Sequence, residues 1–138
     1  MHANLTHIAL HVKDVQACRH FYESYCGLRV VRTRGEPAEP IYWLAEPGRE
    51  SAFILVLLPG GPGQCHPDGD FSHLGFALDS RAAVDAAAET AKAEGRLLWP
   101  PRQEPWPVGY YCGVWDPDGN QVEFSYGQPL GPGADLGG

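Results

Sequence analysis

The alternation of apolar and polar residues predicts a strand near the start of the chain, and helical spacing predicts a helix directly after it. Asp14 stands at the position of a helix N-cap, and Gly27 can end the helix in a left-handed conformation. The strands predicted by alternation around this helix cover residues 5–12, 28–33, 41–45 and 52–58. The first part of the chain therefore predicts a β-α-β-β-β unit.

The same order of elements is predicted again after a stretch rich in glycine and proline. A second helix is predicted over residues 81–94, among strands at 71–78, 96–99, 110–115 and 121–126. We expect an α+β fold of two βαβββ modules, whose curled sheets carry helices on one face and form a metal-binding cup on the other. The predicted boundaries are 1–58 for the first module, 59–70 for a linker, 71–127 for the second module and 128–138 for a flexible tail.

Composition narrows the class of protein. The chain has 138 residues and a formal net charge of −7, which argues against nucleic acid as a partner because phosphate binding needs a basic surface. No apolar run approaches the length of a membrane span, and the N-terminus lacks the pattern of a secretory signal. The four cysteines have neither Cys-x-x-Cys spacing nor disulfide density, so we expect a reduced, cytoplasmic protein.

Strand parity brings titratable side chains to the face opposite the helices. On the first strand one face is entirely apolar and is expected to lie under the helix, which leaves His7 and His11 facing the cup. His73 holds the matching place in the second unit, and Glu123 alternates with apolar neighbours on the last strand. We predict that His7, His73 and Glu123 bind one divalent ion of Fe, Mn, Ni, Co or Zn. His11 is predicted either to contact substrate or to be a hydrogen-bonded core histidine.

Aromatic residues supply further candidates near the end of the second unit. Tyr110 and Tyr111 are adjacent in a strand, so one of them can point into the cup, where its hydroxyl could orient or protonate a substrate. Packing in the sheet is the alternative interpretation for each of them. Trp106, between two prolines, could form an aromatic lip that contacts substrate.

Several motifs together resemble a known family. The chain is similar, over residues 4–127, to the vicinal oxygen chelate superfamily of glyoxalases, bleomycin-resistance proteins and extradiol dioxygenases. The motifs that carry the resemblance are His7 to Asp14, Phe21-Tyr22 ahead of Cys26-Gly27-Leu28, Ser72 to Phe76, and the hairpin Asp116 to Glu123. The resemblance implies metal ligands at His7, His73 and Glu123, the same three residues that strand parity selects.

The resemblance also shows where this chain departs from the family's members. The fourth ligand position, by alignment of the two halves, falls on Leu55, whereas glyoxalase I uses a carboxylate there as ligand and base. Two histidines and one carboxylate are the set that extradiol dioxygenases use for Fe(II) and fosfomycin thiol transferases for Mn(II). The former also have a histidine before the final hairpin, and the latter need basic residues; residues 103–115 contain no histidine, and Arg102 is the single basic residue after Trp99. A neutral or enolisable ligand is favoured.

Two functions remain open from the sequence. The first is a metal-dependent enzyme, a glyoxalase-like lyase or isomerase or an extradiol-type dioxygenase, that binds a small substrate through vicinal oxygens and stabilises an oxyanion or enolate. The alternative is a non-catalytic binding protein of the bleomycin-resistance type, in which Trp43, Trp99 and Trp106 would suit a cationic or aromatic ligand. The resemblance implies a homodimer, and the linker would permit exchange of modules between chains.

Overall fold

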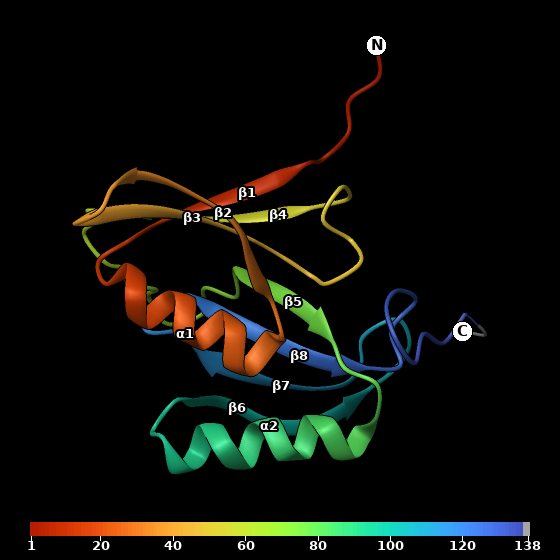
Figure 1. Ribbon diagram of the computed structural model, residues 1–138. Coiled ribbons are helices and arrows are strands. Elements are labelled where there is room, and N and C mark those ends of the chain that lie inside the picture. Colours follow the sequence, from red (N-terminus) through yellow and green to blue (C-terminus); the bar gives the residue numbers. More distant parts are fainter. Residues whose placement is uncertain (137–138) are drawn as a thin grey trace. The chain divides into compact units, whose positions relative to one another are not determined.

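The computed structural model describes residues 1–136 and divides the chain into two compact units, of which the second begins at Cys65. The elements of the first unit are β1 (His7–Val12), α1 (Val15–Cys26), β2 (Arg29–Glu36), β3 (Glu39–Ala45) and β4 (Ile54–Pro59). Those of the second unit are β5 (His73–Ala77), α2 (Arg81–Ala93), β6 (Leu97–Glu104), β7 (Gly109–Trp115) and β8 (Gln121–Tyr126). The predicted α+β fold of two βαβββ modules is confirmed (Figure 1).

Each unit contains one four-stranded mixed sheet with the same topology. The strand order is β1-β4-β3-β2 in the first unit and β5-β8-β7-β6 in the second. In each unit the first strand runs parallel to the last, and the remaining neighbours are antiparallel. A parallel pair needs a long crossover connection, which the helix and the two middle strands supply here. No helix within residues 1–136 is both long and apolar enough to cross a membrane.

The helix ends follow the predicted capping residues. The side chain of Asp14 accepts a hydrogen bond from the backbone N–H of Ala17, and that of Ser80 accepts one from the backbone N–H of Ala83. α1 ends at Gly27, whose φ of 68° lies in the left-handed region that glycine adopts without a steric penalty. These caps fix where each helix begins to cross its sheet.

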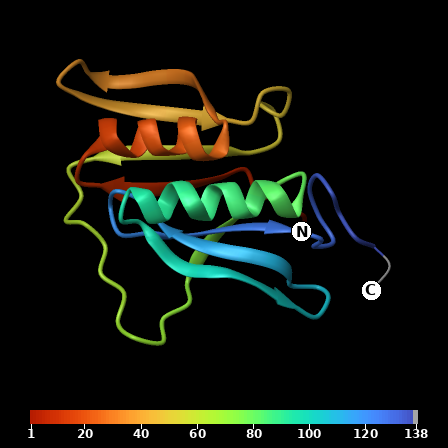
Figure 2. The ribbon, with the colours of Figure 1, turned by 90° about the horizontal axis from the view of Figure 1, so that it is seen from below.

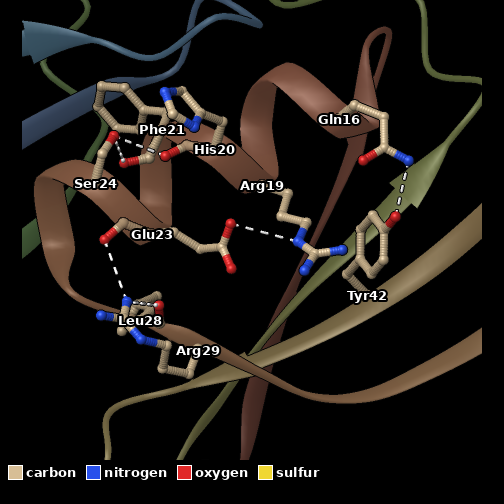
Figure 3. A network of polar contacts seen from close by, with 9 residues as sticks. All are labelled: Gln16, Arg19, His20, Phe21, Glu23, Ser24, Leu28, Arg29 and Tyr42. Atoms are coloured by element: carbon tan, nitrogen blue, oxygen red, sulfur yellow. Dashed lines mark hydrogen bonds and ion pairs between the residues drawn. The ribbon is translucent and has the colours of Figure 1, made fainter.

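The helix α1 is attached to the first sheet by an apolar face and by a small polar network. Buried side chains on α1 include Phe21 and Tyr22. At the polar edge, Gln16 donates a hydrogen bond of 2.8 Å to the hydroxyl of Tyr42 on β3 (Figure 3). The guanidinium of Arg19 lies 4.7 Å from the centroid of the Tyr42 ring and also pairs with Glu23 at 3.4 Å. Tyr42 therefore joins β3 to α1 through contacts of its ring and its hydroxyl.

The core of the second unit lies between α2 and one face of its sheet (Figure 2). The fully buried side chains of the strands include Cys112, Val122 and Phe124, and α2 contributes Val84. The Cys112 thiol contacts the carbonyl of Val84 at 3.8 Å, and burial raises its pKa to about 11. Cys112 is therefore a buried apolar side chain rather than a nucleophile.

The strand β6 is longer than the sequence predicted. The predicted strand ended at Trp99, whereas β6 continues through Pro100 and Pro101 to Glu104. β6 is the edge strand of its sheet, with β7 on one side only. An edge strand tolerates proline, because the missing N–H can fall on the side without a partner.

The C-terminal segment, residues 127–136, folds back on the second unit, which the prediction of a loose tail did not foresee. The backbone of Gly131 approaches Ala77 so closely that a Cβ there would lie 2.4 Å from the alanine Cβ. A Cβ at Gly133 would lie 2.1 Å from the Tyr126 ring. Trp106 donates a 2.7 Å hydrogen bond from its indole to the carbonyl of Asp135. Glycines that suggested flexibility in the sequence instead permit close packing here.

Candidate functional site

The strand register of the second unit places small residues on both sides of Glu123. Gly75 on β5 and Gly113 on β7 are its partners in the parallel and antiparallel ladders. Side chains of registered partners point to the same face, so neither ladder partner places a side chain of its own beside this carboxylate. A Cβ at Gly75 would lie 3.7 Å from Oε2 of Glu123. The predicted orientation of Glu123, opposite the helix-covered Val122 and Phe124, is the one that the structure shows.

His73 and Glu123 form the titratable pair of this face. The Nδ1 of His73 lies 2.5 Å from the carbonyl of Phe71, and because a carbonyl only accepts, Nδ1 carries the proton. The other nitrogen, Nε2, faces Oε2 of Glu123 at 3.9 Å, which is too long for a hydrogen bond. With the proton on Nδ1, the neutral form of His73 has its lone pair on Nε2, 3.9 Å from a carboxylate whose side chain is 10% exposed, so this form brings two electron-pair donors together across a short gap.

Gln128 holds the carboxylate of Glu123 from the C-terminal segment. Its Nε2 donates to Oε2 of Glu123 at 3.3 Å and to the carbonyl of Val108 at 2.8 Å. The amide thus joins the loop between β6 and β7 to the carboxylate on β8. This hydrogen bond restrains the carboxylate. The ladder neighbours Gly75 and Gly113 cannot do so, because they have no side chains.

A pocket of about 720 Å³ opens over this pair. Its walls are mainly aromatic, proline and aliphatic, with few polar groups. The lining residues are Phe71, His73, Gly75, Trp99, Pro100, Arg102, Pro107, Val108, Tyr111, Glu123 and Gln128. All belong to the second unit. An apolar pocket with a few converging polar groups is the usual form of a small-molecule site.

The segment from Asp70 to Ser72, directly before β5, is held by hydrogen bonds at both of its ends. These bonds fix the position of His73, the first residue of the strand. The side-chain amide of Gln121 donates to the carbonyls of Asp70 and Ser72, at 2.8 and 2.7 Å. The carboxylate of Asp70 accepts from the backbone N–H of Ser72 at 3.0 Å and pairs with His66 at 2.9 Å. These two hydrogen bonds, the backbone one first, lower the pKa of Asp70 to about 2 from its ordinary 3.8.

This lowered pKa predicts an acid-sensitive contribution to stability. The folded state keeps Asp70 ionised at lower pH than the unfolded chain does, so its stabilisation is complete above pH 3.8 and is lost as the pH falls toward 2. We expect the wild type to have a higher urea midpoint than Asp70→Asn at pH 5, and this difference to shrink by pH 2.5. A difference of the same size at both pH values would contradict the assignment.

The structure places the other predicted site residues in several different locations. Tyr111 lines the pocket, whereas Tyr110 points to the opposite face, where its hydroxyl donates to Asp85 of α2 at 2.5 Å. The prediction of Tyr110 as a catalytic residue is therefore wrong for this pocket, because adjacent strand residues face opposite sides. Trp106 does not line the pocket; its indole is bound to the C-terminal segment, and its neighbour Pro107 forms the wall instead.

Two predicted residues belong to the first unit. His7 and His11 are both exposed on β1. The Nδ1 of His7 is 2.9 Å from the hydroxyl of Thr6, and Nε2 of His11 is 3.1 Å from the carbonyl of Pro59. Within neither unit, over residues 1–136, do three His, Cys, Asp or Glu residues gather as a metal-binding group. His7 as the third ligand stays a prediction from the sequence.

The counterpart of Glu123 in the first unit is Val56, not Leu55. In the second unit Glu123 pairs with Gly75, two residues after His73; in the first unit Val56 pairs with Ala9, two residues after His7. The alignment by sequence was one residue out of register, which moves a side chain to the opposite face. Val56 is as apolar as Leu55, so the fourth position still lacks a carboxylate.

Phe71 and Gln128 line the pocket but were not predicted as site residues from the sequence, and Trp99 was predicted only as a ligand contact of the alternative, non-catalytic binding protein. Trp99 stood at the predicted end of β6, Phe71 at the first residue of a predicted strand, and Gln128 in a predicted loose tail. The sequence indicates the position of Trp99 only in part: it places Trp99 in a strand, but that strand continues further than predicted. Gln128 lies in irregular backbone, where no periodic pattern indicates the direction of a side chain.

The comparisons with known proteins agree with this architecture. The family model for the Glyoxalase/Bleomycin resistance protein/Dioxygenase superfamily matches residues 4–124. A Pseudomonas aeruginosa protein described as uncharacterized is 58% identical over 135 residues, which are 98% of this chain and 96% of that protein.

Two solved structures extend the comparison. A possible glyoxalase from Bacillus cereus superposes with a TM-score of 0.66 and 30% identity, over 88% of this chain and 97% of that one. The fosfomycin resistance protein FosX from Listeria monocytogenes, crystallised with Mn(II) and dihydroxypropylphosphonic acid, superposes with a TM-score of 0.70 over 91% of this chain and 93% of that one. At 23% identity the FosX comparison shows a common fold.

Proposed function

Because the chain belongs to the Glyoxalase/Bleomycin resistance protein/Dioxygenase superfamily, we propose that it is a metal-dependent enzyme that acts on a small substrate through adjacent oxygen atoms. His73 and Glu123 are the proposed ligands from the second unit, and His7 is the proposed third ligand from a first unit. The observation that carries this proposal is the pair of donors, His73 Nε2 and Glu123 Oε2, aimed at each other without a hydrogen bond between them.

The chemistry of this donor pair fits a divalent cation. Two bonds of about 2.1 Å, the usual length for imidazole and carboxylate ligands, can span the 3.9 Å between the two atoms. The hydrogen bond from His73 Nδ1 to the carbonyl of Phe71 is the kind of second contact that orients a metal-binding imidazole. A bound divalent ion supplies Lewis acidity, which stabilises negative charge that develops on a substrate oxygen.

The chain's own groups would position the substrate around this pair. Gly75 leaves the carboxylate of Glu123 open toward the pocket, and Gln128 restrains its orientation. Tyr111 brings a hydroxyl to the same pocket, where it can donate a hydrogen bond to a substrate oxygen. Because Val56 provides no carboxylate at the fourth position, a proton transfer of the glyoxalase I kind would need another base.

The proposal is tested by removal of His73. We expect His73→Ala to lower the affinity for Mn(II) by roughly 100-fold or more, because loss of even an outer partner of a metal ligand costs about 10- to 100-fold. Isothermal titration of chelator-treated protein with Mn(II), Zn(II) and Ni(II) measures the effect. His7→Ala, assayed in the same way, tests the third ligand separately.

His20→Ala is the matched control, because His20 is an exposed histidine of α1 outside the second unit. It should keep the wild-type metal affinity. A wild-type protein that binds none of these ions more tightly than the His73→Ala variant would refute the metal-dependent proposal. That result would favour the non-catalytic binding protein instead.

A further inference from the structure

The pocket of the second unit has an aromatic wall centred on Trp99. The centroid of its indole lies 6.1 Å from that of the Phe71 ring and 6.5 Å from that of the Tyr111 ring. The His73 ring meets the indole edge-on, with centroids 5.8 Å apart and an interplanar angle of 90°. Aromatic rings at these spacings attract further aromatic groups through their quadrupoles as well as through apolar burial.

This wall is incompletely covered within the second unit. Phe71 is 67% exposed although it lines the pocket. A large apolar side chain held at a pocket mouth gains free energy when a ligand covers it. The exposed ring therefore extends the apolar contact surface from Trp99 outward to the pocket entrance.

The charges of the pocket do not suit a strongly anionic ligand. Among the described residues that line it, Arg102 is the one permanent cation, and Glu123 contributes one carboxylate. The guanidinium of Arg102 is already paired with Glu104 at 2.7 Å, and its side chain is 64% exposed. An anion in the pocket would give up water without gaining an unpaired cation, which is unfavourable.

We propose that this pocket selects an uncharged aryl compound whose ring lies against Trp99 and whose adjacent oxygens point toward His73 and Glu123. Only the role of the oxygens rests on the proposed metal function. The selection of the ring rests on Trp99, Phe71 and Tyr111, and it holds with or without a bound ion.

Trp99 is the specificity-determining residue of this proposal because its position is fixed from below. A Cβ at Gly113 would lie 2.3 Å from the indole, so the ring rests directly on the backbone of β7. No alanine fits there without displacement of the indole. Gly113→Ala therefore provides a way to move the aromatic wall while every pocket side chain is retained.

The test uses three probes that separate aromaticity from charge: phenylethylene glycol, cyclohexylethylene glycol and phenylphosphonate. Binding to chelator-treated protein is followed by titration of the indole N–H signals in NMR spectra. We expect saturable binding of phenylethylene glycol with a shift of the Trp99 signal. We expect the cyclohexyl compound and phenylphosphonate to bind about three- to tenfold more weakly.

Variants assign the effect to the wall. Trp99→Leu and Gly113→Ala should each lower the affinity for phenylethylene glycol by about three- to tenfold. Trp99→Phe keeps an aromatic ring, so its affinity should remain within about threefold of wild type. Trp115→Phe is the matched control, because Trp115 does not line the pocket, and it should leave the affinity unchanged. Trp99→Phe guards against an effect that comes from loss of folding.

Equal binding of the phenyl and cyclohexyl glycols, tighter binding of phenylphosphonate, or unchanged affinity in Trp99→Leu would each overturn the proposal. A second titration with Mn(II) present separates it from the proposed function. If the aryl glycol binds as expected but Mn(II) binds neither wild type nor variants, the aryl selection stands and the metal function fails. If Mn(II) binds and the aryl glycol is not preferred, the reverse holds.

Discussion

Replacement of Glu123 by glutamine should reduce the affinity for a divalent ion by more than about 100-fold, with little effect on folding. The amide keeps the size of the side chain and a carbonyl oxygen, but it removes the charge that attracts the cation. The side chain of Glu123 is buried, so its charge is held largely out of water, and a neutral amide there costs less desolvation. Calorimetric titration with Mn(II) and urea unfolding of the same samples measure both quantities.

Two further variants give this prediction its controls. Glu104→Gln removes one negative charge from the same unit, at the exposed pair with Arg102, and should keep the metal affinity. Gln128→Ala keeps Glu123 but removes the hydrogen bond that restrains it, and should lower the affinity for the ion by about tenfold. Glu123→Gln with an affinity within threefold of wild type would exclude this carboxylate as a ligand. A large effect in Glu104→Gln would mean that net charge, not ligation, is being measured.

The orientation of Glu123 could be predicted from sequence because β8 has an apolar face, which packs against α2. Val122 and Phe124 are fully buried beneath that helix, so the residue between them must face the other way. The same alternation could not identify the counterpart of Glu123 in the first unit. Along β4 buried residues occur on both faces, including Leu55 and Val56, so the apolar pattern does not fix the register.

The wall of the candidate pocket was less predictable for a different reason. Trp99 and Gln128 take their positions from contacts made by backbone that has no simple period: an edge strand with two prolines and a glycine-rich segment. The role of Trp99 depends on Gly113, which pairs with it across the ladder and has no side chain to separate the indole from the sheet. Such a dependence becomes visible only when the register is known.

Replacement of Asp116 by alanine should destabilise the second unit by about 3 kcal/mol. Asp116 is 3% exposed and turns the hairpin between β7 and β8. Its carboxylate accepts hydrogen bonds from the backbone N–H groups of Asp118 and Asn120, both at 2.8 Å, and from the Asn120 side chain at 2.9 Å. Alanine leaves these buried donors without that acceptor, and each such loss costs roughly 1–3 kcal/mol before water relieves part of it.

Two buried thiols allow this loss to be assigned to one unit. Cys112 belongs to the second unit and Cys18 to the first, and both are fully buried. Because a thiol reagent reaches them only after opening, the labelling rate follows the population of the open form. We expect Asp116→Ala to accelerate labelling of Cys112 by roughly 100-fold, since 1.4 kcal/mol corresponds to a factor of ten. Labelling of Cys18 should change much less.

The same hairpin connects stability to the proposed site. It sets the register in which Gly113 lies beside Glu123, so a loosened turn changes the surroundings of the carboxylate as well as the fold. Asp68→Ala, at an exposed aspartate of the second unit, is the control and should alter stability by less than about 0.5 kcal/mol. If Cys112 is labelled at the same rate in Asp116→Ala as in Asp68→Ala, the carboxylate of Asp116 does not hold this turn. The position of Glu123 would then have to come from the strand ladders alone.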